Sequence, residues 1–304
     1  MKHTSRFYHL LAIFSIIVWG TTFVSTKLLL LNGLTPPEIF LYRFAQAYLC
    51  IWFWSPRRLW ADSWKDEALL LLAGISGGSL YFYAENTALG ITLASNVSLI
   101  IATTPILTAL LACAVYRQER LRANLVAGSF VALVGVALVV FNGSFILEIN
   151  PLGDLLTLFA AGLWAVYSLV LKRLENGYPV LFITRKIFFY GLLTLLPSLA
   201  VTPVSPLSVL VRPVVWGNLL FLGLVASMLC YLMWNVALKN LGVVRVTNYI
   251  YINPLVTLIA SSIVLDEVIT GVAVLGSVLI LGGVYMAESG FRRPFFLQKK
   301  DPDR

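Results

Sequence analysis

The sequence predicts an all-α integral membrane protein with ten transmembrane helices, arranged as two inverted five-helix repeats. Of its 304 residues, 59% are hydrophobic and 12% are charged, whereas about 25% of the residues of a soluble domain are charged. Apolar runs of about 20 residues, the length that crosses about 30 Å of hydrocarbon as a helix, follow one another along nearly the whole chain. The same landmark residues also occur in the same order in both halves.

The ten apolar runs leave no stretch long enough for a soluble domain. A transmembrane β-barrel would show segments of about 10 residues with alternating hydrophobicity, and runs such as LVALVGVALVV do not alternate. Lys2 and Arg6 precede the first run as in a signal peptide, but the run is long and lacks a small-residue cleavage site, so we expect an uncleaved helix. The expected helices cover Leu10–Leu31, Pro36–Ser55, Ala68–Leu89, Leu93–Tyr116, Ala123–Phe141, Leu152–Leu171, Val180–Ala200, Val214–Leu238, Val244–Leu265 and Thr270–Glu288.

Basic residues are distributed unevenly between the two sides of the predicted membrane. With the N-terminus inside, nearly all of them fall on the inner side, and the outer side holds only Arg212. The positive-inside rule therefore predicts that both termini are cytoplasmic. This bias accounts for the net charge of +8, so no nucleic-acid partner is expected. The inner residues are Lys2, Arg6, Arg57, Arg58, Lys65, Arg117, Arg120, Arg122, Lys172, Arg173, Lys239, Arg245, Arg292, Arg293, Lys299, Lys300 and Arg304.

The few cysteines and histidines do not form a pattern that would indicate a metal site or a disulfide. The three cysteines lie in separate apolar runs without CxxC spacing, and both histidines lie near the N-terminus. Structural zinc sites and disulfide frameworks require grouped ligands or paired cysteines. We therefore expect no metal, no cofactor and no catalytic centre, and the chain is not predicted to be an enzyme.

The chain contains two copies of one unit, expected at residues 1–143 and 144–290, followed by a basic cytoplasmic tail at 291–304. The spacing from tryptophan to lysine is the same in Trp19/Lys27 and Trp164/Lys172, and three further pairs match equally well. Because each unit has five spans, the second enters the membrane from the opposite side, as in the inverted repeats of secondary transporters. The further pairs are Pro37/Arg43 with Pro179/Arg185, Asn86/Pro105 with Asn235/Pro254, and Glu119/Gly128 with Glu267/Gly276.

Three segments of the first half resemble the drug/metabolite transporter superfamily, EamA type. They are WGTTFVSTK, PEIFLYRF, and the block NTALGITLASNVSLIIATTPILTALLACAVYRQERLRANLVAGSFVALVGVAL. The resemblance extends over essentially the whole chain, twice. It implies ten helices and, in bacterial members, export of amino acids or related small metabolites across the inner membrane.

Three charged residues lie inside predicted spans, where charge is costly and needs a partner, a watery cavity or a route to the interface. Lys27, Arg43 and Glu85 all fall in the outer half of the membrane at compatible depths. One hypothesis is that they line the outer part of a central cavity and leave a net positive field for a carboxylate. The alternative is that Glu85 pairs with one cation while Lys27 extends its ammonium to the interface.

Polar and aromatic residues at helical spacing extend this set of candidate substrate-binding residues. Several lie well inside their spans, away from the interfacial belts where tryptophan and tyrosine usually occur. The alternative is that each one only hydrogen-bonds a neighbouring helix. The additional candidates are Trp19, Tyr81, Asn96, Trp164, Tyr231, Asn235 and Asn248.

Glycine and proline have structural roles in this prediction. The small-residue pairs Gly74/Gly78, Gly128/Ala132 and Gly283/Ala287 favour close helix packing. Pro105 and Pro254 fall within the fourth and ninth predicted helices and should kink both. They are candidates for matched hinges, or they shape the cavity.

Together these features predict a secondary transporter that exports its small-molecule substrate by alternating access. No GxxxxGK[ST] motif is present, so nucleotide coupling through this chain is not expected. Glu85 is the candidate for carrying a coupling proton. A drug or nucleotide-sugar carrier is the alternative within transport, and a pore or a membrane enzyme is the alternative outside it. The sequence does not predict an oligomeric state.

Overall fold

The computed structural model describes residues 2–54, 60–92, 94–116, 123–141, 150–200, 202, 205–264 and 270–289. Every regular element within these ranges is helical, which confirms the all-α prediction. Seven helical segments are long and apolar enough to cross a membrane, and two shorter apolar helices cover Ala123–Leu138 and Gly271–Ala287. The seven segments are Arg6–Leu31, Trp64–Ile91, Val97–Val115, Pro151–Leu174, Val180–Leu199, Pro213–Leu241 and Val243–Val264.

Four of the ten expected spans are interrupted and consist of more than one element. The third span comprises α3 and α4 joined by η1, and the eighth comprises α11 and α12 joined by η2. The first half contains α1 (Lys2–Leu31), α2 (Pro36–Trp54), α3 (Trp64–Gly74), η1 (Ile75–Ser79), α4 (Leu80–Ile91), α5 (Ala94–Ile101), α6 (Thr104–Val115) and α7 (Ala123–Phe141). The second half contains α8 (Pro151–Leu174), α9 (Val180–Leu199), α10 (Leu207–Leu210), α11 (Pro213–Leu220), η2 (Phe221–Leu229), α12 (Cys230–Leu241), α13 (Val243–Thr247), η3 (Asn248–Ile252), α14 (Asn253–Val264) and α15 (Gly271–Ser289).

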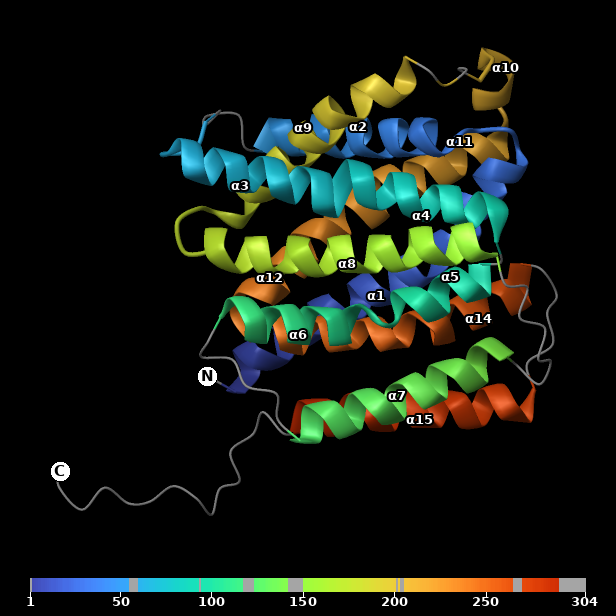
Figure 1. Cartoon of the computed structure of the whole chain (residues 1–304). Helices are drawn as coiled ribbons and strands as arrows, with labels where there is room; N and C mark the ends of the chain where they lie inside the picture. Colours follow the sequence, from blue (N-terminus) through green and yellow to red (C-terminus); the bar gives the residue numbers. More distant parts are fainter. Residues whose placement is uncertain are drawn as a thin grey trace.

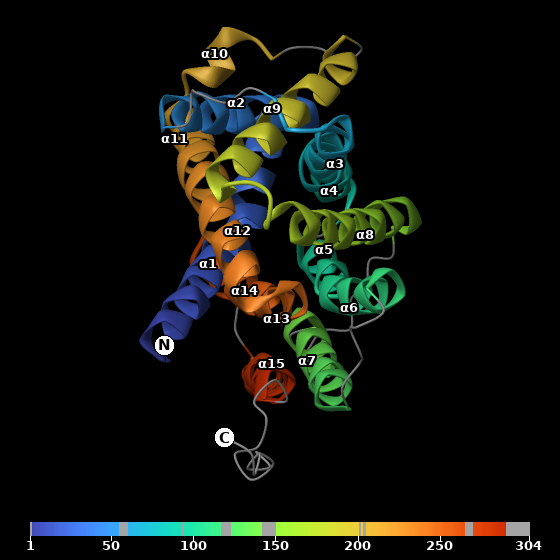
Figure 2. The same cartoon turned by 90° about the vertical axis from the view of Figure 1, so that its left-hand side faces the viewer.

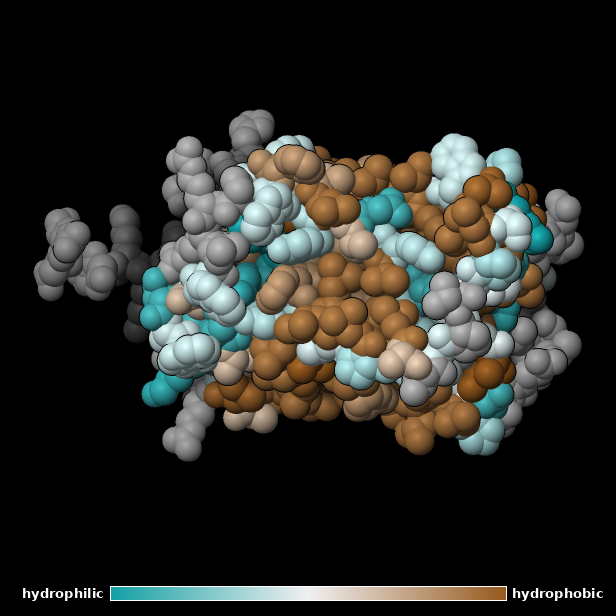
Figure 3. All heavy atoms as spheres, turned by 90° about the horizontal axis from the view of Figure 1, so that it is seen from above, coloured by the Kyte–Doolittle hydropathy of each residue, from teal (hydrophilic) through white to brown (hydrophobic). Residues whose placement is uncertain are grey.

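The helices run roughly parallel to one another across the view of Figure 1, and α7 and α15 form one edge of the bundle in both ribbon views (Figure 2). The start of α1 and the end of α15 lie at the same end of the bundle. Figure 3 shows one face that is mostly hydrophobic across its middle, with hydrophilic residues gathered toward both ends. This distribution fits a belt of lipid around the helices, because lipid tails contact apolar side chains and the headgroups contact polar ones.

Both prolines that were expected to kink a helix lie in the first turn of a new helix. Pro105 is the second residue of α6, after a turn that ends α5. Pro254 is the second residue of α14, after the 3₁₀ segment η3. The missing N–H of proline removes no hydrogen bond at this position, so each span is divided just before its proline.

Small residues bring helices into close contact at the predicted places. A Cβ atom added to Gly128 would lie 2.5 Å from the backbone nitrogen of Ala287, and one added to Gly283 would lie 2.5 Å from that of Ala132. The two pairs therefore pack against each other across α7 and α15. Gly74 faces Tyr190 and Gly191 of α9 with similarly little room.

The segments η1 and η2 are π-helical, which the sequence did not predict. Gly77 precedes Asn86 by the same interval as Ala226 precedes Asn235, so the two segments occupy matching places in the halves. The Tyr231 hydroxyl donates a hydrogen bond of 2.5 Å to the Gly77 carbonyl, and the Trp19 indole donates one of 2.8 Å to the Ala226 carbonyl. Each half thus supplies an aromatic donor to the π segment of the other half. Such segments occur frequently at functional sites.

Candidate functional site

A cavity of about 40 Å³ lies inside the bundle between the two halves. Small-molecule sites usually measure about 300 to 1,000 Å³, so the helices around this cavity must move apart before a substrate fits. The wall combines one basic residue and one acidic residue with aromatic and apolar side chains. It is formed by Trp19, Thr22, Phe23, Arg43, Tyr81, Phe82, Glu85, Ile101, Thr104, Trp164, Tyr231, Ile250 and Asn253.

The basic residue of the cavity is Arg43, which α2 places there with an exposed fraction of 2%. Its Nε donates a hydrogen bond of 2.9 Å to Ser227 Oγ of η2. The guanidinium carbon lies 4.2 Å from the centre of the Phe82 ring, within the range of cation–π attraction. These contacts orient the guanidinium but do not neutralise its charge.

The acidic residue is Glu85 on α4, with an exposed fraction of 7%. Its Oε1 accepts a hydrogen bond of 2.8 Å from the Tyr81 hydroxyl, one turn earlier on the same helix. Among the residues that the structure describes, no ion pair joins Glu85 to Arg43. Both charges therefore line one cavity without pairing, although burying an unpaired charge is costly.

Lys27, the third predicted charge, is not part of the cavity wall. Its Nζ donates a hydrogen bond of 2.6 Å to the carbonyl of Leu89 and lies 3.5 Å from that of Thr92. The last carbonyls of a helix have no partner within it, and the negative end of the helix dipole attracts a cation. Lys27 therefore caps the end of α4.

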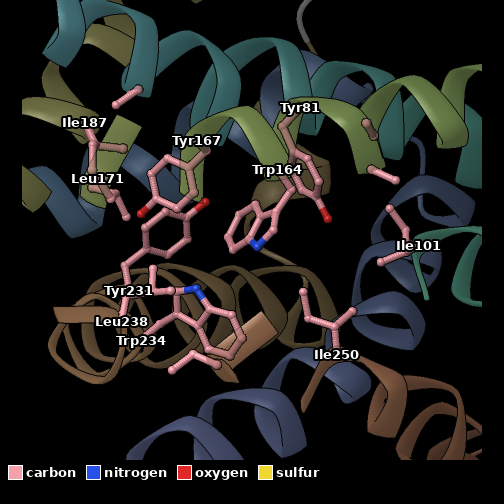
Figure 4. Packing of buried hydrophobic residues seen from close by; sticks show 14 of the residues in the cluster. Tyr81, Ile101, Trp164, Tyr167, Leu171, Ile187, Tyr231, Trp234, Leu238 and Ile250 are labelled. Atoms are coloured by element: carbon pink, nitrogen blue, oxygen red, sulfur yellow. The ribbon is translucent and has the colours of Figure 1, made fainter. Parts of the chain in front are cut away.

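Aromatic side chains from four helices form most of the remaining wall. Trp19 and Trp164 are in edge contact with ring centres 5.2 Å apart, and Tyr81 lies 5.0 Å from Trp164. Tyr231 lies 5.8 Å from both tryptophans. Figure 4 shows Tyr81 and Trp164 side by side on one side of the cluster and Tyr231 with Trp234 facing them. All four of the predicted aromatic candidates thus meet at one place.

Two of the three predicted asparagines, Asn235 and Asn248, do not line the cavity. Asn235 is bonded on both sides, because its Oδ1 accepts from the Tyr167 hydroxyl at 2.8 Å and its Nδ2 donates to Thr184 Oγ1 at 3.0 Å. Asn248 is buried away from the cavity wall, and neither amide atom has a hydrogen-bond partner. Asn96 belongs to α5, but its side chain lies outside the described residues, as do Glu119 and the tail at 291–304.

Several cavity residues were missing from the prediction. Thr104 and Asn253 stand immediately before the matched prolines, so the repeat itself could have identified them. Ile101 and Ile250 each stand four residues before the same prolines, so they too occupy matching places in the two halves. Arg185, the counterpart of Arg43, is buried near Trp52 and Phe182 and does not line the cavity.

A second buried charge cluster lies between α3 and α9, outside the cavity wall. Lys186 forms an ion pair with Glu67, and the Tyr190 hydroxyl donates a hydrogen bond to the same carboxylate. The backbone N–H of Ala61 donates to Glu67 Oε2 at 2.7 Å. This cluster joins α3 to α9 with its carboxylate fully bonded, so its role is structural.

Comparison with known proteins identifies the family. A model of the EamA-like transporter family matches residues 6–141 and, a second time, residues 151–288. The chain belongs to this family. Like other EamA-like transporters it is a multi-pass membrane protein that moves a small molecule, and it is not an enzyme.

Curated relatives of this EamA-like transporter span most of its length. An uncharacterised transporter of Archaeoglobus fulgidus is 28% identical over 91% of this chain and 96% of its own length. A Salmonella typhimurium protein named "probable amino-acid metabolite efflux pump" is 28% identical over 93% of this chain and 95% of its own length. A Streptantibioticus cattleyicolor protein named "probable terminal-alkyne amino-acid exporter" is 30% identical over 73% of both chains.

The fold of the EamA-like transporter is also seen in a solved crystal structure. That chain is 20% identical, covers 92% of this chain and 96% of its own length, and superposes with a TM-score of 0.71. At this level of identity the likeness concerns the fold alone.

Proposed function

We propose that this EamA-like transporter is a secondary transporter that exports amino acids or related small metabolites by alternating access, with the central cavity as its substrate site. The observation that carries the proposal is the pair of buried charges, Arg43 and Glu85, which line one cavity without pairing to each other. A small molecule with charges of both signs would satisfy both groups when it binds. The names of the relatives from Salmonella typhimurium and Streptantibioticus cattleyicolor support export of such molecules.

The proposed cycle uses ten transmembrane helices in two inverted repeats, residues 1–143 and 144–290. The double match of the family model and the matching places of η1 and η2 support this arrangement. Two similar halves can exchange inward-open and outward-open shapes around one central site. We place both termini in the cytoplasm of the inner-membrane protein, because the basic residues gather on that side.

Two further elements of the cycle belong to the same proposal. Glu85 is the residue through which a coupling proton would act, because it is the acidic residue of the cavity wall. Pro105 and Pro254 mark the helix breaks beside Thr104 and Asn253, so movement there would change the shape of the cavity directly. A purely cationic drug would leave Arg43 without a counter-charge, and a nucleotide sugar would bring two negative charges to one arginine.

The decisive experiment is counterflow in proteoliposomes that contain the purified protein. The panel comprises amino acids, monocarboxylates, sugars and cationic drugs, each tested for exchange against its radiolabelled form. We expect exchange of amino acids or close analogues, and none of sugars or cationic drugs. If a pH gradient dissipates and no panel member exchanges, the protein is a proton pathway or pore rather than an exporter.

A further inference from the structure

The cavity wall contains polar atoms that have no partner in the protein. The indole Nε1 of Trp164 is a buried donor without a hydrogen-bond acceptor, and Oδ1 of Asn253 is a buried acceptor without a donor. Both residues are 5% exposed and line the cavity. Buried polar groups in proteins almost always have a partner, so each exception requires an explanation. A ligand inside the cavity would supply these partners.

Each of the two unpartnered atoms has the same hydrogen-bonding character as one of the two charged residues. The Trp164 N–H is a donor, like the guanidinium of Arg43, and a carboxylate accepts from both kinds of group. The Asn253 oxygen is an acceptor, like Glu85, whose carboxylate receives only the Tyr81 hydroxyl among the described residues. An ammonium group donates to both. The wall therefore offers one set of groups to an anion and another to a cation.

The rest of the wall bears no charge. Apart from Arg43 and Glu85, the lining consists of aromatic residues, two isoleucines, two threonines and Asn253. A ligand side chain with a charge of its own would be buried here without a counter-ion, which disfavours binding. An apolar or aromatic side chain would instead pack against Phe23, Trp19 and Tyr231.

We propose that the cavity takes a zwitterionic α-amino acid with an uncharged, apolar or aromatic side chain. Arg43 and the Trp164 N–H bind its carboxylate, and Glu85 and the Asn253 oxygen bind its ammonium group. This assignment rests on the proposed export function. It adds Asn253 to the candidate substrate-binding residues and gives the Trp164 N–H a specific role. It also specifies which amino acids are accepted and which are rejected.

A matched set of ligands tests the assignment by competition for counterflow. Phenylalanine carries both charged groups, phenylethylamine lacks the carboxylate, and 3-phenylpropionate lacks the ammonium group. Lysine and glutamate keep the zwitterion but add a charged side chain. We expect phenylalanine to exchange and the other four to compete at least about tenfold more weakly. A site built to hydrogen-bond a group rejects analogues that lack it, and the uncharged remainder of the wall disfavours a charged side chain.

The outcomes separate this inference from the proposed function. If lysine or glutamate exchanges as well as phenylalanine, or if either truncated analogue competes equally, the assignment fails while the exporter stands. If no amino acid exchanges at all, both fail. Exchange of phenylalanine alone supports both.

Variants identify which residue binds which end of the ligand. Glu85→Gln should weaken the binding of phenylalanine and should no longer discriminate against 3-phenylpropionate. Arg43→Gln should no longer discriminate against phenylethylamine. Trp164→Phe keeps a ring but removes the N–H, so KM for phenylalanine should rise about tenfold, as for the loss of one hydrogen bond to a charged group. A merely structural residue would change stability without altering these ratios.

Trp216→Phe is the matched control, because Trp216 lies on α11 at the exposed surface and outside the cavity wall. We expect it to leave KM and all ligand ratios unchanged. The thermal unfolding midpoint of each variant in detergent shows whether it is folded. An unchanged KM in a folded Trp164→Phe protein would overturn the assignment of the indole N–H.

Discussion

Lys27 and Lys172 occupy matching places in the two halves and have different partners. The ammonium of Lys27 bonds the carbonyl of Leu89 at the end of α4, whereas that of Lys172 lies 4.4 Å from the centre of the Tyr116 ring. A repeated residue therefore need not repeat its role. The difference arises because each lysine meets the neighbours that packing provides at its own end of the bundle.

Replacing Lys27 should affect stability rather than substrate recognition. Lys27→Met removes the cap of α4, and we expect a loss of roughly 1.5 to 3 kcal/mol, as for a hydrogen bond that involves a charged group. The thermal unfolding midpoint and the counterflow KM measure the two effects separately. A large increase in KM at an unchanged unfolding midpoint would show that Lys27 takes part in substrate binding.

Glu175 should make stability depend on pH. It follows α8, outside the membrane-spanning helix, and burial raises its pKa from 4.5 to about 7, although Lys239 and Lys172 act to lower it. Because the folded state holds this proton more tightly than the unfolded chain, the contribution of Glu175 to stability is fully present below about pH 4.5 and is lost as the pH rises through about 7.

Glu175→Gln tests this dependence. The variant keeps a neutral group at all pH values. Its thermal unfolding midpoint should therefore rise relative to that of the parent protein as the pH increases from 5 to 8. Parallel pH profiles for the two proteins would show that the carboxyl group of Glu175 does not contribute.

At the scale of the element, the π segments depend on contacts between the two halves. The Gly77 carbonyl receives the Tyr231 hydroxyl, and a Cβ atom at Gly77 would overlap the Tyr167 ring. Neither condition is visible in the local sequence ISGGS. This is why the sequence predicts a continuous helix where the structure has a π segment.

Removing the hydroxyl of Tyr231 should loosen η1. In Tyr231→Phe we expect amide hydrogen exchange in residues 75–79 to accelerate about fivefold to tenfold, because the net value of one hydrogen bond is about 1 kcal/mol. Hydrogen exchange with mass spectrometry in substrate-free protein measures this. Tyr83→Phe, on an exposed face of α4, is the control, and equal exchange in both variants would contradict the expectation.

The contact between α7 and α15 should tolerate no additional methyl group. Gly283→Ala would place its Cβ 2.5 Å from the Ala132 backbone nitrogen, and overpacking of this kind costs about 1 to 3 kcal/mol. The adjacent Gly282→Ala is the control, since nothing lies within 4 Å of its Cβ position. The two unfolding midpoints should therefore differ clearly, and equal midpoints would show that the helices can separate at little cost.

At the scale of the whole molecule, the sequence predicted the class of fold because the length and apolarity of the spans depend only on the bilayer. It also placed Arg43, Glu85 and the aromatic candidates in the cavity, since charge inside a span requires a special environment. The sequence did not show that Lys27 and Asn235, which were predicted with them, lie outside the cavity wall. Which side of a helix faces the cavity depends on how α1 and α12 pack, and spacing along one helix does not contain that information.

The proposed topology can be tested in intact cells. In a background without the three native cysteines, Arg212→Cys should react with a membrane-impermeant maleimide from outside. Lys65→Cys should react only after the membrane is opened, because the positive-inside rule places it in the cytoplasm. The reverse pattern would invert the orientation of the protein.

The contact between α7 and α15 is reciprocal. Gly128 lies against Gly283 and Ala287, while Gly135 lies against Gly276 and Ile280. Gly276 and Gly283 hold the places in the second half that Gly128 and Gly135 hold in the first. Contacts of this form, in which each partner presents the same patch to the other, define an isologous interface between two identical protomers. One polypeptide thus contains the equivalent of a homodimer interface, with both copies of the patch already occupied by each other.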